Sequence, residues 1–307
     1  MTIVIFTNSS ACPNMTTGNS RPAVPMNKPK EIPLDQDLVT SLAIPPRPKV
    51  LGELFAEMSR DDPDLARAAT MIAADPALAG AMVKAVNSAA FGLSRKVGSV
   101  SQAMSLLGLR NVANIAMSLA IRHAIRGDAG SSMERFWDTA ERVALISARL
   151  AREFRGLPPD EAYTIGLFHD CGIPLLMRRF PDYVGILTEA NRTPGTAFTT
   201  VEDQAFRTNH AVVGYFLARS WDLPADQCEA IQRHHDSALF SETSVRSGRR
   251  LQDLVGVVHL AEHVHHRAAR DGFDLEWDKF EGPVLRHFGM HEEDLADIIE
   301  EFAAYAA

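Results

Sequence analysis

The chain has 307 residues, 46 % hydrophobic and 23 % charged, which is ordinary globular composition and enough chain for a sizeable core. Its 31 Lys and Arg residues against 39 Asp and Glu residues give a formal net charge of −8. A negative surface argues against general nucleic-acid binding, which needs cationic contacts to phosphate. Three cysteines without a CxxC pair argue against a disulfide scaffold or a Cys-zinc site, and we expect a reducing cytoplasm.

We expect no membrane segment, because no apolar run approaches the roughly 18 residues that span a bilayer. The short apolar start also lacks the basic region of a signal peptide. Residues 1–44 show little periodicity and are rich in proline, which predicts a flexible leader. Translation could start at Met1 or at Met26, and the sequence leaves both open.

A helical pattern begins after this leader. Leu51, Leu54, Phe55 and Met58 recur at i, i+3, i+4 and i+7, which predicts one buried face of a helix. No convincing alternation of apolar and polar residues follows, so the sequence predicts an all-α protein of packed helices.

Helix starts are visible in the first half of the chain. Asp62 and Asp75 each precede a proline, a pattern typical of an N-cap followed by proline in the first turn. Ser99 with Gln102 fits a capping box before an apolar stretch.

Glycines predict the breaks between the later elements. Gly108 marks the start of a helix over 109–126, and the turn formers of 127–132 divide an N-terminal helical block, 45–130, from a second block, 131–307. We expect a polar loop over 240–250. The second-block helices are predicted near 131–155, 159–169, 172–220 (several short ones), 224–235, 251–270, 275–287 and 291–305.

Histidines at predicted helix ends are the candidate chemistry. His169 and Asp170 follow one apolar helix, His210 opens another, and His234 and His235 end a third. Imidazole and carboxylate are ligands for first-row divalent ions, so neighbouring helices could form a cage for Fe, Mn or Zn. Such an ion can polarise phosphate and generate hydroxide. Alternatively, buried His and Asp side chains can hold the bundle together by hydrogen bonds without a metal.

Other candidate groups favour plainer interpretations. Cys171 could be a nucleophile, but no base is evident beside it, so we interpret it as a small buried residue. A histidine cluster could bind metal or sense pH, yet we prefer to interpret its members as partly exposed polar residues of a helix. Scattered arginines could hold an anion or be solvated surface. These residues are His259, His263, His265, His266, Arg178, Arg179, Arg233, Arg246, Arg249 and Arg250.

Ten segments occur in the order found in one family, and the span from about residue 45 to 305 resembles the HDOD domain, a relative of the HD-type metal phosphohydrolases. In the first block they are Ile44-Pro-Pro-Arg-Pro, Asp75-Pro-Ala-Leu-Ala, Val86-Asn-Ser-Ala-Ala-Phe-Gly, Ser99-Val-Ser-Gln-Ala and Leu106-Leu-Gly-Leu-Arg. In the second block they are Phe136-Trp, Gly166-Leu-Phe-His-Asp-Cys-Gly, Asn209-His-Ala-Val-Val-Gly, Trp221-Asp-Leu-Pro and Ile231-Gln-Arg-His-His. The resemblance implies an N-terminal helical bundle packed on an HD-like helical bundle.

The chain departs from the HD enzymes at two expected ligands. By alignment, Thr139 stands where those enzymes carry a histidine, and Glu262 stands nearest to a late aspartate. The Gly-Tyr-Pro signature of the cyclic-di-GMP phosphodiesterase branch is absent after His235. The resemblance therefore implies a degenerate metal site, for which His169, Asp170, His210, His234 and His235 are the remaining candidate ligands.

Three functions follow from this pattern. We expect a non-catalytic regulatory module of bacterial signal transduction, cytoplasmic, acting through contact with a protein partner. The alternatives are a residual metal-dependent phosphohydrolase or phosphodiesterase, and a sensor that binds a nucleotide second messenger without hydrolysing it. We assign no catalytic residue to the regulatory module.

Overall fold

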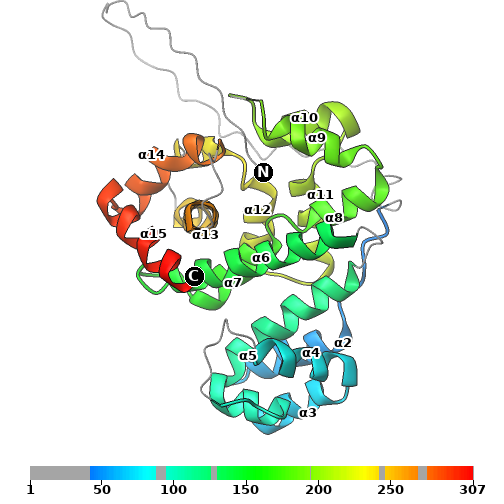
Figure 1. The fold of residues 1–307 in the computed structure, drawn as a ribbon. Coiled ribbons are helices and arrows are strands. Elements are labelled where there is room, and N and C mark those ends of the chain that lie inside the picture. The colour runs from blue at the N-terminus through cyan, green and yellow to red at the C-terminus, as the bar shows by residue number, and fades with distance from the viewer. Residues whose placement is uncertain are drawn as a thin grey trace, which may run out of the picture.

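The computed structural model describes residues 42–87, 95–125, 130–193, 195–241, 246–268 and 275–306. Every regular element within these ranges is a helix, which confirms the predicted all-α class (Figure 1). The predicted flexible leader falls almost wholly outside the described residues, as do residues 127–129 of the predicted boundary. Residues 130–132 of that boundary are helical, so the predicted turn does not extend over them.

Among the described residues, the N-terminal lobe consists of α2 (Lys49–Met58), α3 (Leu65–Ala73), α4 (Pro76–Val86) and α5 (Val100–Ala124). Asp75 caps α4 as predicted, accepting hydrogen bonds from two backbone N–H groups at 2.9 and 3.1 Å. The predicted cap at Asp62 is wrong, because α3 starts later and Asp64 caps it. The Asp64 carboxylate accepts from the N–H groups of the second and third helical residues at 2.9 and 3.0 Å, so the helix begins two positions further on.

Helix α5 is broken where the sequence predicts it. Gly108 has φ 78° and ψ 167°, a conformation that glycine tolerates and that interrupts the helix. By length and composition α5 could cross a membrane, although no membrane segment is expected from the sequence. However, 56 % of its most apolar window is buried, and it packs against α2, α3, α4 and α7 (Pro159–Phe168). It is therefore a core helix of this fold.

The remaining helices form the C-terminal lobe. Helix α13 begins at Arg246, inside the segment predicted as a polar loop over 240–250, and residues 242–245 lie outside the described part. The elements are α6 (Gly130–Leu150), α7 (Pro159–Phe168), α8 (Gly172–Arg179), α9 (Tyr183–Ala190), α10 (Phe198–Phe206), α11 (His210–Ser220), α12 (Ala225–Arg233), the 3-10 helix η2 (Ser237–Ser241), α13 (Arg246–Ala268), α14 (Trp277–Phe288) and α15 (Glu292–Ala306).

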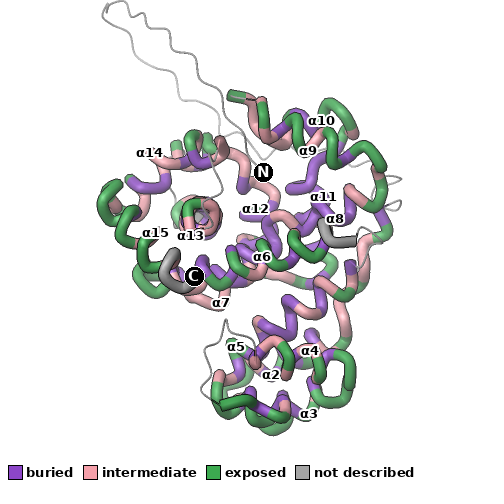
Figure 2. Tube along the Cα trace, in the orientation of Figure 1, coloured by how far each residue is buried: buried purple, intermediate pink, exposed green. Residues whose placement is uncertain are grey.

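The two lobes share one hydrophobic core, and the chain segment before α2 straps them together (Figure 2). Leu42 is buried, and the Arg178 guanidinium donates to its carbonyl at 2.9 Å. The Trp221 indole donates to the Pro45 carbonyl at 3.0 Å, and Arg47 donates to the Trp221 carbonyl at 3.0 Å. This strap fixes the N-terminal lobe beside the start of α12.

Helices α8 and α11 approach each other closely at Gly172. A Cβ atom there would lie 2.0 Å from the backbone oxygen of His210 and 2.9 Å from the backbone nitrogen of Gly214. Only a residue without a side chain fits between these backbones, and the approach brings the end of α7 to the start of α11.

We expect Gly172→Ala to lower the free energy of unfolding by about 3 kcal/mol, because the added methyl group overpacks a rigid backbone contact. Gly185→Ala is the matched control, since Gly185 lies in α9 with nothing within 4 Å of an added Cβ. That control should be neutral or slightly stabilising, by up to about 1 kcal/mol. Urea unfolding followed by circular dichroism measures both, and equal stability of the two variants would contradict the close approach.

Candidate functional site

Helix termini place the predicted side chains around one point. His169 follows the last residue of α7, Asp170 lies in the turn before α8, and His234 and His235 follow α12. His210 is the first residue of α11 because Asn209 caps that helix, accepting from a backbone N–H at 2.9 Å. Side chains at helix ends can turn toward neighbouring helices, and these do so.

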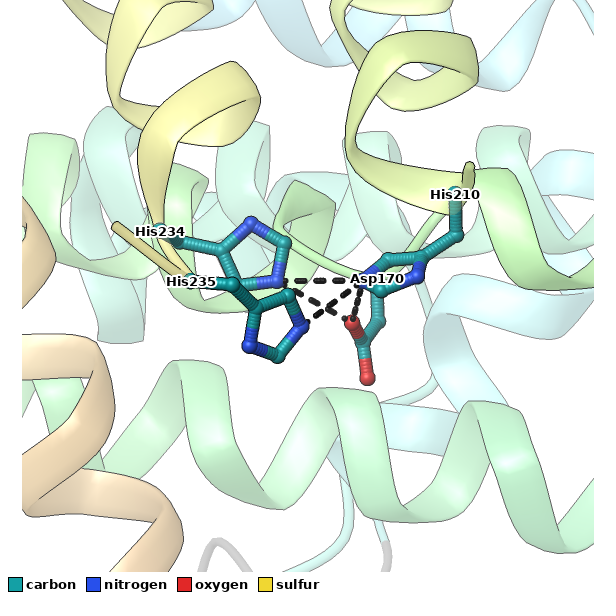
Figure 3. Close-up of side chains that lie close together, drawn as sticks. All are labelled: Asp170, His210, His234 and His235. Carbon is teal, nitrogen blue, oxygen red and sulfur yellow. Dashed lines mark hydrogen bonds and ion pairs between the residues drawn. The ribbon is translucent and has the colours of Figure 1, made fainter. Parts of the chain in front are cut away.

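Three imidazoles and one carboxylate converge in the first cluster (Figure 3). The Nε2 atom of His210 lies 2.9 Å from Nε2 of His235 and 3.2 Å from Nε2 of His234. Oδ1 of Asp170 lies 3.3 Å from Nε2 of His210 and 3.4 Å from Nε2 of His234. His210 and His234 are buried, and 27 % of the Asp170 side chain is exposed.

The other ring nitrogen of each imidazole is held by an acceptor. His210 donates through Nδ1 to Oε2 of Glu202 at 2.6 Å, and His235 donates through Nδ1 to Oε1 of Glu276 at 2.7 Å. His234 donates through Nδ1 to the carbonyl of Ile231 at 2.7 Å. Carboxylates and carbonyls can only accept, so each Nδ1 carries the proton and each neutral ring presents an Nε2 lone pair to the cluster.

This donor set fits a divalent metal ion. When all three rings are neutral, their Nε2 lone pairs repel unless a cation lies among them, and outer acceptors on Nδ1 are the usual surroundings of metal-bound histidine. Metal–nitrogen bonds of about 2.0–2.1 Å give neighbouring ligand atoms separations of about 3.0–3.4 Å. Four of the separations in this cluster are 2.9, 3.2, 3.3 and 3.4 Å, at or within about 0.1 Å of that range. The His/Asp cluster is compatible with a metal site.

The second cluster shares Asp170 but is built as an ion pair. His169 donates through Nδ1 to the Gly166 carbonyl at 2.9 Å, and its Nε2 lies 3.2 Å from Oε1 of Glu262 and 3.5 Å from Oδ2 of Asp170. Glu262 also lies 3.4 Å from Nδ1 of His259. Here carboxylates face imidazoles, so protons alone can satisfy the second cluster, and His169, Asp170 and Glu262 also lie close enough together to hold a metal ion.

The charges of the metal-free clusters follow from these contacts. Burial by itself lowers the pKa of His169, but the carboxylates of Asp170 and Glu262 outweigh it and raise that pKa to about 9. Burial likewise lowers the pKa of His210, while Glu202 and Asp170 raise it to about 10. Burial and the neighbouring His235 lower the pKa of His234 to about 3. One cationic imidazole and one neutral imidazole therefore lie side by side.

The acidic groups are held in their charged form. Burial by itself would raise the pKa of Asp170, but His169, His210 and His234 hold that pKa well below its usual range. The pKa of Glu262 is likewise well below its usual range, since His169 outweighs burial. Ionised carboxylates at this point favour either a proton or a metal ion on the facing imidazoles.

The structure brings all five candidate ligands together, and it brings Glu262 beside them. It does not bring in Thr139, whose side chain is exposed on α6. Sequence reasoning missed the outer carboxylates Glu202 and Glu276, and it did not connect His259 with this site. Glu276 lies 41 residues from His235, and neither glutamate lies in a motif that marks it.

An all-helical protein with histidine and aspartate gathered at helix ends is the class that this fold and site define. Within that class, a sequence model of the HDOD domain matches residues 44–237, and the chain belongs to the HDOD domain family. The chain is also 28 % identical over 199 residues to an uncharacterized protein of Treponema pallidum. That match covers 63 % of this chain but 38 % of the relative, so this chain spans well under half of it.

Solved structures share the fold. An HDOD domain protein of unknown function from Geobacter sulfurreducens superposes with a TM-score of 0.66 at 22 % identity, covering 87 % of this chain and 93 % of that one. A candidate phosphohydrolase from Shewanella amazonensis gives 0.66 at 23 % identity, with the same coverage. A candidate signal transduction protein from Marinobacter aquaeolei gives 0.64 at 20 % identity, covering 90 % of this chain and 62 % of that one.

We expect Glu202→Gln to weaken divalent-metal binding about 10- to 100-fold, because it removes the charge that orients and polarises the His210 ring. Glu189→Gln is the matched control, since Glu189 is exposed on α9. Competition against a chelating dye measures both affinities, with circular dichroism to verify folding. Equal affinity in the two variants would mean that His210 is not a ligand.

We also expect metal affinity to fall with falling pH. The pKa of His210 is about 10 without metal, so below that pH a proton must leave before the ring can bind a metal ion. Between pH 6 and 8 the affinity should rise by about tenfold per pH unit for each proton displaced. Dye competition at several pH values, corrected for the dye's own protonation, tests this; a flat profile would contradict it.

Proposed function

We propose that this chain is a non-catalytic regulatory module of signal transduction that holds one divalent metal ion and acts through contact with a protein partner. The ion, Fe, Mn or Zn, would be bound by Asp170, His210, His234 and His235. Its role would be to tie the ends of α7, α11 and α12 into one rigid unit. Membership of the HDOD family and the fold shared with the candidate signal transduction protein from Marinobacter aquaeolei support the regulatory part of the proposal.

The observation that carries the proposal is the number of protein ligands in the first cluster. Four donor atoms from four residues lie within 4.8 Å of one another. Sites filled by four protein ligands are typical of structural metals, whereas catalytic sites keep a position for water or substrate. The second cluster supplies no comparable set of lone pairs, because Glu262 is paired with His169 and His259.

A residual phosphohydrolase is the second candidate, and one observation favours it. The Asp170 side chain is 27 % exposed and that of Glu262 is 24 % exposed, so the shared carboxylate has an open side. A metal ion bound there would activate water and polarise a phosphate. Glu202 and Glu276 would hold the His210 and His235 rings in place for the ion by accepting from their Nδ1 atoms.

The remaining expectations belong to the same proposal. We place the module in the bacterial cytoplasm, without membrane association and without general nucleic-acid binding, which agrees with the net charge of −8. Binding of a nucleotide second messenger without hydrolysis is the remaining alternative, and a melting-temperature shift would detect it.

Metal content and turnover test the proposal together. The untagged protein should contain about one equivalent of Fe, Mn or Zn by inductively coupled plasma mass spectrometry, and a His169→Ala, Asp170→Ala double variant should lose it. The matched control is an Asp182→Ala, His291→Ala double variant, since both side chains are exposed. The wild type and the control variant, which both keep the metal, should not hydrolyse cyclic dinucleotides or other phosphoesters.

Each other result changes the conclusion. Absence of metal from the wild type after reloading overturns the metal site. Hydrolysis by the wild type but not by the double variant replaces the regulatory module with the phosphohydrolase. A melting-temperature shift caused by a cyclic dinucleotide without hydrolysis would indicate the sensor.

A further inference from the structure

A cleft lies between the two lobes, away from the histidine cluster. The α2–α3 region and α5 form one side, and the start of α7 and the start of α12 form the other. Its volume is about 1380 Å³, larger than the roughly 300–1,000 Å³ typical of small-molecule pockets. The cleft is therefore of a size that suits a polymer segment.

One wall of this interlobe cleft is apolar and accessible. Phe55, Met58 and Leu107 line it and are only partly buried. Leu65, at the start of α3, is 44 % exposed. An accessible strip of this kind is suited to apolar side chains of a ligand.

The arginines of the interlobe cleft are all paired with carboxylates. Each of the four arginines that line it has a carboxylate within 3.4 Å, so a phosphate would have to displace an existing ion pair. This argues against a nucleotide and favours an uncharged ligand. The pairs are Arg47 with Asp222 at 2.9 Å, Arg60 with Glu57 at 3.4 Å, Arg110 with Asp160 at 3.0 Å and Arg250 with Asp226 at 3.3 Å.

Carboxamides supply the remaining polarity. Asn111 and Asn114 lie along α5, and Gln227 lies on α12 across the cleft. Gln227 is 4 % exposed, and its Oε1 atom has no hydrogen-bond partner among the described residues. An unsatisfied buried acceptor costs stability, so its presence here points to a donor that a ligand supplies. A carboxamide pairs a donor with an acceptor, as a peptide group does.

We propose that the interlobe cleft binds an extended, uncharged segment of a protein partner. Successive side chains of an extended peptide point to opposite sides, so alternate apolar residues would contact the wall at Leu65 while the main chain meets the carboxamides. The inference rests on the proposed function, because it names the surface through which a regulatory module would contact its partner.

The probe is a phage-displayed library of random peptides, selected on the full-length protein, with affinities of the enriched peptides measured by fluorescence anisotropy. Leu65→Glu should weaken their binding at least about tenfold, because it places a charge on the apolar wall. It should fold, since an acidic residue suits the first turn of a helix. Leu145→Glu is the matched control: Leu145 is 37 % exposed on α6 and does not line the cleft.

A second variant separates a binding role of Gln227 from a structural one. Gln227→Met removes the unsatisfied oxygen, so it should raise the melting temperature by about 2 °C while weakening peptide binding about tenfold. Gln252→Met is its control, because the Gln252 amide donates to the Leu239 carbonyl at 2.9 Å in a buried position outside the cleft. That control should lower the melting temperature and leave peptide affinity unchanged.

The inference is overturned if no enriched peptide depends on Leu65, or if Gln227→Met destabilises the protein as Gln252→Met does. Binding of a cyclic dinucleotide that Leu65→Glu abolishes would also overturn it. These results are independent of metal content and turnover. If the protein holds metal and does not hydrolyse phosphoesters but binds no peptide in the cleft, the proposed function stands and its contact surface lies elsewhere. If the cleft binds peptides and the protein hydrolyses phosphoesters, the peptide site stands and the non-catalytic function is overturned.

Discussion

Three imidazoles from two helix ends gather at one point, with His210 within hydrogen-bond distance of His234 and His235, and they would repel unless negative charge or a metal ion balances them. Asp170 is the group placed to do this, because its two oxygens face His169, His210 and His234. The carboxylate can reach them only because Gly172 lets α8 approach the backbone of α11. A tight backbone contact and an electrostatic cluster therefore depend on each other, and together they fix how α7, α8, α11 and α12 meet.

The same arrangement separates two kinds of histidine chemistry. At His210, His234 and His235 the protons are held on Nδ1 by outer acceptors, so lone pairs gather at one point. At His169 the ring faces a carboxylate that also meets His259. The first arrangement suits a metal ion and the second suits a proton. This difference, and not the loss of one histidine, is the physical reason for expecting a single ion.

Local physics made part of the fold predictable. The Asp75 cap and the break at Gly108 follow from side-chain capping and from glycine's access to positive φ, which are properties of a few neighbouring residues. The prediction of a cap at Asp62 is wrong because Asp64 offers the same carboxylate two positions later, and the pattern of neighbouring residues does not distinguish the two. The start of α13 was missed because its first turn is polar and lacks the apolar period.

The sequence by itself determined the all-helical class, the likeness to the HDOD domain and the placing of His169, Asp170, His210, His234 and His235 at helix ends. These depend on periodicity and on motifs of a few residues. Only the tertiary structure decided that Glu202 and Glu276 orient those rings, that Thr139 lies outside the site, and that a cleft with an unsatisfied amide separates the lobes. Such pairings join residues up to 93 positions apart, as His169 and Glu262 are, and packing alone brings them together.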